Sequence, residues 1–331
     1  MTNSLTDIPG ILVGHWTDAA NGTGCTVVLT PDGACAGVDV RGSSPGTRET
    51  DLLDPTTGVD RVHGIVLSGG SAYGLGAAHG AVRWLAENGY GWPTAAARVP
   101  IVSSAILYDL GFNGSAVYPT EADAYAACRS ATASDASRGN IGAGTGCTVG
   151  KLLGFANASR GGLGQASVTL PGGAIVAALV AVNAIGDIVD PVAAQIIAGG
   201  RDPESGQLAD ALATLAARFD QFLFRRPPVR ENTSIGVVAT NLPLNKAQAT
   251  KLAQMAQAGI TRTTRPAHTM YDGDCLFALG TGRLDIPYEL SLLGGIAAQV
   301  VSAAVLDGVR NATAGFGLPA ASELRPLPLA K

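Results

Sequence analysis

The segment RRPPVRENTSIGVVATN (residues 225–241) joins two kinds of chain without a spacer. Its first half combines Arg, Pro and polar residues, a composition typical of exposed, irregular backbone. Its second half, residues 233–240, is rich in β-branched and small apolar residues and predicts a strand that enters a core. The pair Asn232-Thr233 stands where the two halves meet. The segment therefore predicts a strand that begins abruptly at a residue bearing a hydroxyl group.

Apolar runs on both sides of this segment predict further strands and helices. No fixed-period repeat is present, and the short strands alternate with fewer, longer apolar helices. This pattern favours a layered α/β fold over an all-helical or all-β fold. We expect strands at 25–30, 34–40, 63–68 and 275–282, two buried strands within 161–191 joined at Pro171-Gly172-Gly173, and a strand or loop at 101–110. We expect helices at 69–89, 121–131, 203–219, 245–258 and 290–312.

The composition limits the possible partners. Charged residues make up 15% of the 331 residues and hydrophobic ones 47%, whereas soluble proteins carry roughly 25% charged residues. Such a low fraction of charged residues predicts that much of the surface is covered by other copies of the same chain. The net charge of −4 without a basic cluster argues against nucleic acid. The longest apolar run, 174–182, is shorter than the roughly 20 residues that a membrane-spanning helix needs.

The cysteines and histidines predict neither a metal site nor disulfides. Five Cys and four His are scattered without zinc-ligand spacing. The Gly-rich stretches 69–76 and 139–151 match neither the dinucleotide-binding nor the Walker pattern, so close packing through small residues is favoured. The first residues show no secretory signal pattern. We therefore expect a reduced, cytoplasmic protein with buried thiols and without metal or cofactor.

Asn232-Thr233 has a specific chemical interpretation. A Thr hydroxyl can attack the preceding carbonyl in an N→O acyl shift, and water can then cleave the resulting ester. The new N-terminal α-amine has a reference pKa of about 7.7–8.0 and can deprotonate the hydroxyl of its own residue. By itself, Asn-Thr is weak evidence, because capping or glycosylation-like Asn-Thr-Ser loops are common.

Taken with the rest of the chain, ENTSIGVVATN resembles the processing site of the DmpA-type L-aminopeptidase/D-esterase family. It is most similar to the nylon-oligomer hydrolase (NylC-like) branch, and SSAILYDL and HTMYDGDCLFALGTG extend the resemblance along the chain. The resemblance implies an N-terminal-nucleophile hydrolase with a four-layer αββα sandwich. It also implies a single domain, cut into an α-subunit (1–232) and a β-subunit (233–331). Such pairs assemble further, often as four αβ pairs.

The resemblance implies roles for particular residues. Thr233 matches the nucleophile, and Asn232 the residue whose carbonyl is released. Asp272 and Asp274 match a pair of acids, and in extended backbone such i, i+2 carboxylates share one face. Two nearby like charges raise one pKa, and the pair could orient the Thr233 amine and hydroxyl. The alternative from the residues alone is a solvated Asp-Gly turn.

Three further residues match the lining of the family's site. Lys151 could hold a developing oxyanion, or could be a surface side chain with an exposed ammonium. Asn183 lies within an apolar strand, where its amide must find partners, as an oxyanion donor or as a structural hydrogen bond. Tyr108 suits a substrate-pocket wall or the core. His268 lies close before the acid pair, but we expect no Ser-His-Asp triad, because an N-terminal nucleophile needs no His.

The leading hypothesis is a self-cleaving amidohydrolase or peptidase that acts on small peptides or non-natural amides through an acyl-enzyme. One alternative is an acyl transferase like the ornithine acetyltransferases, although their Ala-Thr-Met-like junction is missing here. The other alternative is an unprocessed binding protein whose Gly-rich loops hold a ligand. Thr in place of the aminopeptidase branch's Ser, together with the Asp pair, leaves the substrate open.

Overall fold

A nine-stranded mixed sheet forms the centre of the protein in the computed structural model, which describes residues 2–112, 116–217, 219 and 232–329. Its strands are β1 (Leu12–Asp18), β2 (Thr23–Val40), β3 (Thr47–Arg48), β4 (Val62–Ser68), β7 (Val102–Ile106), β10 (Leu163–Thr169), β11 (Ile175–Asn183), β14 (Thr233–Thr240) and β16 (Cys275–Gly280). The order is β10-β11-β14-β16-β2-β4-β7-β3, with β1 also paired to β2. β14 is antiparallel to β11 and parallel to β16, so three segments distant in sequence meet side by side.

The long strand β2 divides the sheet into two layers. Its residues 23–29 pair with β1 and its residues 25–29 with β4, whereas residues 35–40 pair with β16. The register with β4 shifts between Leu29 and Ala34. Apolar side chains from both layers form one inner core, including Val28, Ile65 and Leu67 from one layer and Leu179, Val237 and Phe277 from the other.

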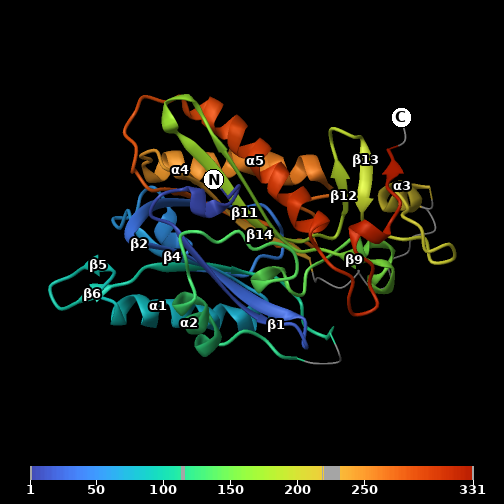
Figure 1. The fold of residues 1–331 in the computed structure, drawn as a ribbon, viewed down its shortest axis with the longest axis horizontal. Helices are drawn as coiled ribbons and strands as arrows, with labels where there is room; N and C mark the ends of the chain where they lie inside the picture. Colours follow the sequence, from blue (N-terminus) through green and yellow to red (C-terminus); the bar gives the residue numbers. More distant parts are fainter. Residues whose placement is uncertain (1, 113–115, 218, 220–231, 330–331) are drawn as a thin grey trace.

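Helices cover the outer face of each layer. α4 (Lys246–Thr263) and α5 (Leu290–Arg310) pack on β10, β11, β14 and β16, and α1 (Ala78–Glu87) and α2 (Glu121–Arg129) pack on β1, β2 and β4. Figure 1 shows the two helix pairs on opposite sides of the strands. This confirms the layered α/β prediction and the expected four-layer αββα order.

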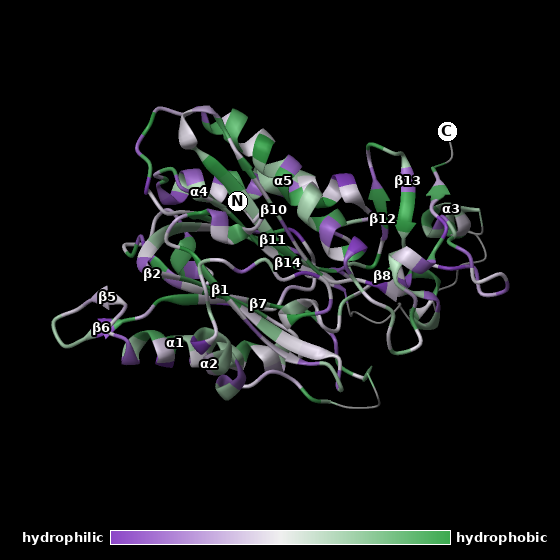
Figure 2. Ribbon diagram, viewed as in Figure 1, coloured by the Kyte–Doolittle hydropathy of each residue, from purple (hydrophilic) through white to green (hydrophobic). Residues whose placement is uncertain are grey.

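Two capping residues define where the helices over β14 begin. The Asn245 side chain accepts from the backbone N–H of Gln248, and the Glu289 carboxylate accepts from Ser291 and Leu292. Figure 2 shows hydrophobic residues along β11, β14 and α5, where the core lies. Among the described residues, α5 is the one helix long and apolar enough to cross a membrane. Its most apolar window is 67% buried in the protein, as expected of a core helix.

Smaller elements gather at one end of the sheet. A four-stranded sheet has the order β15 (Thr264–Arg265), β12 (Asp187–Asp190), β13 (Gln195–Ala198) and β17 (Leu327–Pro328). Two short hairpins pair β5 (Trp92–Pro93) with β6 (Arg98–Val99) and β8 (Thr148–Val149) with β9 (Ser159–Arg160). Figure 1 places β12, β13 and α3 (Ala211–Ala216) beside the ends of β11 and β14.

Three sequence expectations need correction. Of the helix predicted at 203–219, only α3 forms. The Asp210 side chain caps the N-terminus of α3 by accepting a hydrogen bond from the Ala213 N–H, and the Asp202 carboxylate holds residues 204–205 in a turn before it. The two strands expected at 25–30 and 34–40 are one strand, and the apolar run after residue 174 is divided into β11 and β12. Residues 220–231, which include most of the irregular segment expected before Asn232, lie outside the described residues.

The five cysteines are all buried and unpaired, which confirms the expectation of buried thiols. Burial raises the pKa of the Cys128 and Cys147 thiols to about 12. A thiol with so high a pKa carries little thiolate at neutral pH, so these groups are poor nucleophiles and poor metal ligands.

Candidate active site

The ends of three adjacent strands bring the predicted site residues together. Thr233 opens β14, and its Cα partner on β11 is Asn183, the last residue of that strand. On the other side of β14, Asn232 forms a bridge with Asp272 just before β16 begins. Side chains alternate along a strand, and Ile235 and Val237 lie in the inner core. The Thr233 side chain therefore points between the two layers of the sandwich, on the same face as Asn183.

The peptide bond between Asn232 and Thr233 is enclosed and hydrogen-bonded. Asn232 is 3% exposed and Thr233 5% exposed. The Thr233 hydroxyl donates to the Asn232 carbonyl oxygen, and the backbone N–H of Gly273 donates to the same oxygen at 2.9 Å. The hydroxyl thus lies next to this carbonyl, and a second donor polarises the carbonyl.

A cluster of polar groups surrounds Asn183. Lys151 Nζ donates to the Asn183 side-chain oxygen at 2.8 Å and to its backbone oxygen at 3.1 Å. The side-chain oxygen also accepts from the backbone N–H of Thr148 at 3.0 Å, while Nδ2 donates to the backbone oxygen of Tyr108 at 3.0 Å. Lys151 is buried, so its ammonium is held inside the protein rather than at the surface. Lys151, Asn183 and Tyr108 therefore form one connected group beside Thr233.

The two acids each have a set of hydrogen-bond donors. Asp274 Oδ1 accepts from the backbone N–H of Ser234 at 2.7 Å. Asp272 Oδ2 accepts from the backbone N–H and the hydroxyl of Thr269, at 2.8 and 2.6 Å, and Oδ1 from the Ile185 N–H at 3.4 Å. Burial and the nearby Asp274 charge raise the pKa of Asp272 to about 6. The acids are thus close together and buried, unlike a solvated Asp-Gly turn.

The register of β14 against β16 decides which group lies beside Thr233. Ile235 pairs with Cys275 and Asn232 bridges to Asp272, so Thr233 faces Gly273 rather than either carboxylate. A side-chain carbon at Gly273 would lie 2.8 Å from the Thr233 hydroxyl oxygen. Asp274 instead reaches the backbone one residue further along, at Ser234. The catalytic roles assigned to these residues remain predictions.

Sequence reasoning missed three contributors to this arrangement. His268 contacts Asp274 through its ring Nδ1, at 2.9 Å from Oδ2, although no triad role had been expected. Thr269 holds Asp272 in a Thr-x-x-Asp pattern, which is a recognisable local signal for side-chain-to-backbone hydrogen bonds. Gly273 carries no side-chain signal at all, because its contribution is a backbone N–H and the lack of a Cβ.

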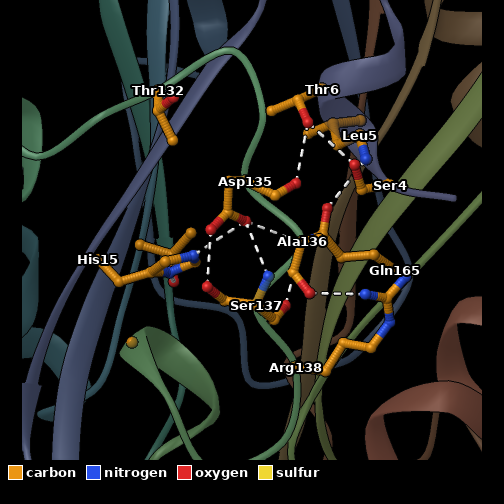
Figure 3. A network of polar contacts seen from close by, with 12 residues as sticks. Ser4, Leu5, Thr6, His15, Thr132, Asp135, Ala136, Ser137, Arg138 and Gln165 are labelled. Carbon is orange, nitrogen blue, oxygen red and sulfur yellow. Dashed lines mark hydrogen bonds and ion pairs between the residues drawn. The ribbon is translucent and has the colours of Figure 1, made fainter. Parts of the chain in front are cut away.

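A second buried network connects a hydroxyl, an imidazole and a carboxylate in the same order as a catalytic triad, but its surroundings indicate a structural role. Figure 3 shows the contacts of His15 and Asp135 within this network. His15 Nε2 lies 3.2 Å from Asp135 Oδ2, and His15 Nδ1 lies 2.9 Å from the Thr26 hydroxyl oxygen. Thr26 is fully buried, and its hydroxyl oxygen accepts the Ala143 N–H at 3.0 Å. Gln165 donates to the Asp135 carboxylate at 2.9 Å. This network connects distant segments and leaves no room for a substrate at the hydroxyl group.

Sequence comparisons connect the chain to known proteins. The family model described as peptidase family S58 matches residues 3–319. An uncharacterised aminopeptidase of Mycobacterium tuberculosis is 40% identical over a 352-residue alignment that covers 98% of each chain. The 6-aminohexanoate-oligomer endohydrolase of Paenarthrobacter ureafaciens is 32% identical, and the alignment covers 91% of this chain and 84% of that protein.

Solved structures share the fold. The L-aminopeptidase D-Ala-esterase/amidase of Ochrobactrum anthropi, described as a new variant of the Ntn-hydrolase fold, superposes with a TM-score of 0.69 and 23% identity. That match covers 97% of this chain and 91% of the other. A Burkholderia β-aminopeptidase superposes with a TM-score of 0.66 and 23% identity, over 94% and 87% of the two chains. The layer order of this protein is thus the layer order of a known hydrolase fold.

Proposed function

The chain belongs to peptidase family S58, and from this premise we propose that it is a self-processing N-terminal-nucleophile hydrolase in which Thr233 is the nucleophile. Its relatives are named as aminopeptidases and amide-oligomer hydrolases, and the chain is a hydrolase of amide bonds. The observation that carries the proposal is the contact between the Thr233 hydroxyl and the Asn232 carbonyl oxygen, which Gly273 also contacts.

Processing would begin with attack of the Thr233 hydroxyl oxygen on the Asn232 carbonyl carbon. The C–N bond to Thr233 breaks as a C–O bond forms, and the proton from the hydroxyl ends on the departing amine. Negative charge on the carbonyl oxygen is stabilised by the Gly273 N–H, which already points at this atom. Water then hydrolyses the ester, which leaves a carboxylate on Asn232 and a free α-amine on Thr233.

Hydrolysis of a substrate would reuse the same nucleophile. The Thr233 α-amine accepts the hydroxyl proton as the oxygen attacks the substrate amide, and the substrate amine leaves as an acyl-enzyme ester forms. Water then releases the acyl group. Asn183 and Lys151, on the same side of β14 as the hydroxyl, supply an amide and a buried ammonium beside the reacting carbonyl. The backbone oxygen of Tyr108 accepts a hydrogen bond from Asn183 Nδ2, and the ring of Tyr108 would line the acyl pocket.

The substrates would be small peptides or linear non-natural amides. Two kinds of relative support this range, because one is named as an aminopeptidase and the other acts on oligomers of 6-aminohexanoate. The shared feature of these molecules is a linear chain joined by amide bonds. We expect the enzyme to need no metal and no cofactor, because hydroxyl, amine and ammonium are all supplied by the chain.

Intact mass analysis and N-terminal sequencing of purified protein test the proposal. The expected products are residues 1–232 and a fragment that begins TSIGVVATN and ends at Lys331. Activity carried by a chain that remains full-length through long incubation would contradict the proposal and favour an unprocessed binding or hydrolytic site. Acyl transfer to an added amine that outpaces hydrolysis would instead identify an acyl transferase.

A further inference from the structure

We propose that His268 is a positioning residue, which acts on the Thr233 nucleophile through Asp274. The proposal rests on the function proposed above and adds a residue to it. Asp274 Oδ2 accepts two hydrogen bonds from His268, one from the backbone N–H at 3.2 Å and one from ring Nδ1 at 2.9 Å. The other oxygen of the same carboxylate accepts the Ser234 N–H at 2.7 Å. The carboxylate is therefore fixed between His268 and the residue that follows the nucleophile.

The second ring nitrogen of His268 is held as well. Nε2 lies 3.2 Å from the hydroxyl oxygen of Thr261, near the end of α4. That hydroxyl also lies 3.2 Å from the backbone oxygen of Gln257, one turn earlier on α4. Ring Nδ1 thus contacts Asp274 and ring Nε2 contacts Thr261. The ring is clamped between α4 and the acid, and its orientation in turn fixes the carboxylate.

Because Asp274 is buried, its contact with His268 should affect how the carboxylate is oriented. Asp274 is 2% exposed, so water cannot replace a lost donor without opening the structure. A buried carboxylate that loses a charged or polar donor pays a large desolvation cost and turns toward other partners. The partner at stake is the Ser234 N–H, which belongs to the peptide group joining Thr233 to the rest of β14. A rotated Asp274 would therefore release the first peptide of the strand that aims the hydroxyl.

The register shows that His268 acts indirectly. Gly273 lies beside Thr233, whereas Asp274 lies beside Ser234, so the imidazole is separated from the nucleophile by a carboxylate and a peptide group. The backbone of His268 also adopts a left-handed conformation, with φ at +57°. Among non-glycine residues, Asn, Asp and His adopt this conformation most often, and here both the backbone N–H and the ring of His268 contact one carboxylate oxygen.

Two substitutions separate the imidazole contact from the backbone conformation. His268→Asn and His268→Gly both accept a left-handed backbone, but only the Asn side chain carries an N–H donor near the position of Nδ1. Processing is measured as the rate at which freshly produced full-length chain disappears on a denaturing gel. Hydrolysis of a short amide is measured on fully processed protein, with kcat and KM determined separately, and thermal unfolding is measured on both variants.

We expect His268→Gly to slow processing and to lower kcat by roughly 10- to 100-fold with little change in KM, the range typical when a partner that orients a reacting group is lost. His268→Asn should recover most of both rates, and its melting temperature should lie above that of the Gly variant, because the Asn amide restores a donor to the buried carboxylate. Equal rates for the two variants would overturn the proposal, whether both are fast or both are slow. A Thr233→Ala chain that still cleaves and hydrolyses would instead contradict the proposed function itself.

Discussion

The backbone N–H of Gly273 lies 2.9 Å from the carbonyl oxygen of Asn232, across the pairing of β14 with β16. The same oxygen accepts the hydroxyl group of Thr233. A fixed backbone donor at an oxygen that gains negative charge costs no reorganisation when the charge develops. The Asp-Gly-Asp sequence thus combines two acids with a residue that can approach Thr233 closely.

Substituting Gly273 should therefore impair processing. In Gly273→Ala, the added Cβ would lie 2.8 Å from the Thr233 hydroxyl oxygen and 2.6 Å from the backbone oxygen of Ser44, so one of them must move. Because small displacements of reacting groups can cost about 10²-fold in rate, we expect cleavage slower by about that factor. A gel time course measures it. Gly295→Ala on α5, where the Cβ would meet open space, is the matched control and should cleave normally.

Thr233 and Ser234 should differ sharply, although they are adjacent hydroxyl residues. Thr233→Ala removes the hydroxyl that contacts the Asn232 carbonyl, so both cleavage and hydrolysis should stop, whereas Thr233→Ser should retain part of each. Ser234 points to the other face of β14, and its role here is its backbone N–H. Ser234→Ala should therefore change either rate little. If Ser234→Ala lost processing and Thr233→Ala did not, Ser234 rather than Thr233 would be the nucleophile.

Lys151 should contribute to hydrolysis rather than to folding alone. Lys151→Met keeps most of the side-chain volume but removes the ammonium that contacts Asn183. We expect kcat to fall by about 10²–10⁴-fold while the far-UV circular dichroism spectrum remains unchanged. Lys251→Met, at an exposed position on α4, is the control for loss of a positive charge. Similar activities in the two variants would rule out a role for the buried ammonium.

The buried acid Asp109 should make stability depend on pH. Burial raises the pKa of Asp109 to about 7, above its ordinary value of 3.8. Between these values the unfolded chain has released this proton and the folded chain has kept it, so the contribution of Asp109 to the free energy of unfolding falls as pH rises from about 4 to 7. Asp109→Asn cannot ionise and keeps an oxygen for the Gly70 N–H, which contacts Oδ1 at 2.6 Å.

Thermal unfolding of this variant at two pH values measures the effect. The free energy of unfolding of Asp109→Asn, measured relative to that of wild type, should increase by more than about 1 kcal/mol between pH 4.5 and pH 8. Each unit of pKa shift corresponds to about 1.4 kcal/mol. The wild-type chain, which carries the same other groups, is the reference at each pH. A difference between the two proteins that is the same at both pH values would show that Asp109 ionises freely in the folded state.

Assembly is expected from the sparse charge and from the apolar surface at α5. Leu292 is 65% exposed and borders a groove of about 250 Å³ that Leu170, Ile286 and Ile296 also line. Buried apolar area contributes roughly 25 cal/mol per Å², so a contact that covers such faces should survive dilution. Light scattering should show particles well above the 33.3 kDa of one chain. A lone chain-sized particle at micromolar concentration would contradict this expectation.

Much of the architecture could be predicted from local patterns. Apolar runs indicated β4, β14 and β16, while the segment of β7 was left open as a strand or a loop. The long apolar segment near 290–312 indicated α5, because hydrophobic periodicity is a property of neighbouring residues. The prediction for 203–219 failed because Asp202 and Asp210 form hydrogen bonds with nearby backbone, which compete with a helix. β1 was missed because its alternation is weak, and its pairing with β2 stabilises it.

The sequence by itself determined the chemistry that the chain carries: a hydroxyl after Asn232, two acids spaced for one face, and a lysine and an asparagine in apolar surroundings. Only the tertiary structure decided how these groups meet. The register of β14 between β11 and β16 sets Asn183 and Gly273 on either side of Thr233, and the end of α4 sets His268 on Asp274. Residue types follow from local chemistry, but strand register depends on which distant segments bury their apolar faces together, and a shift of one residue would exchange every contact.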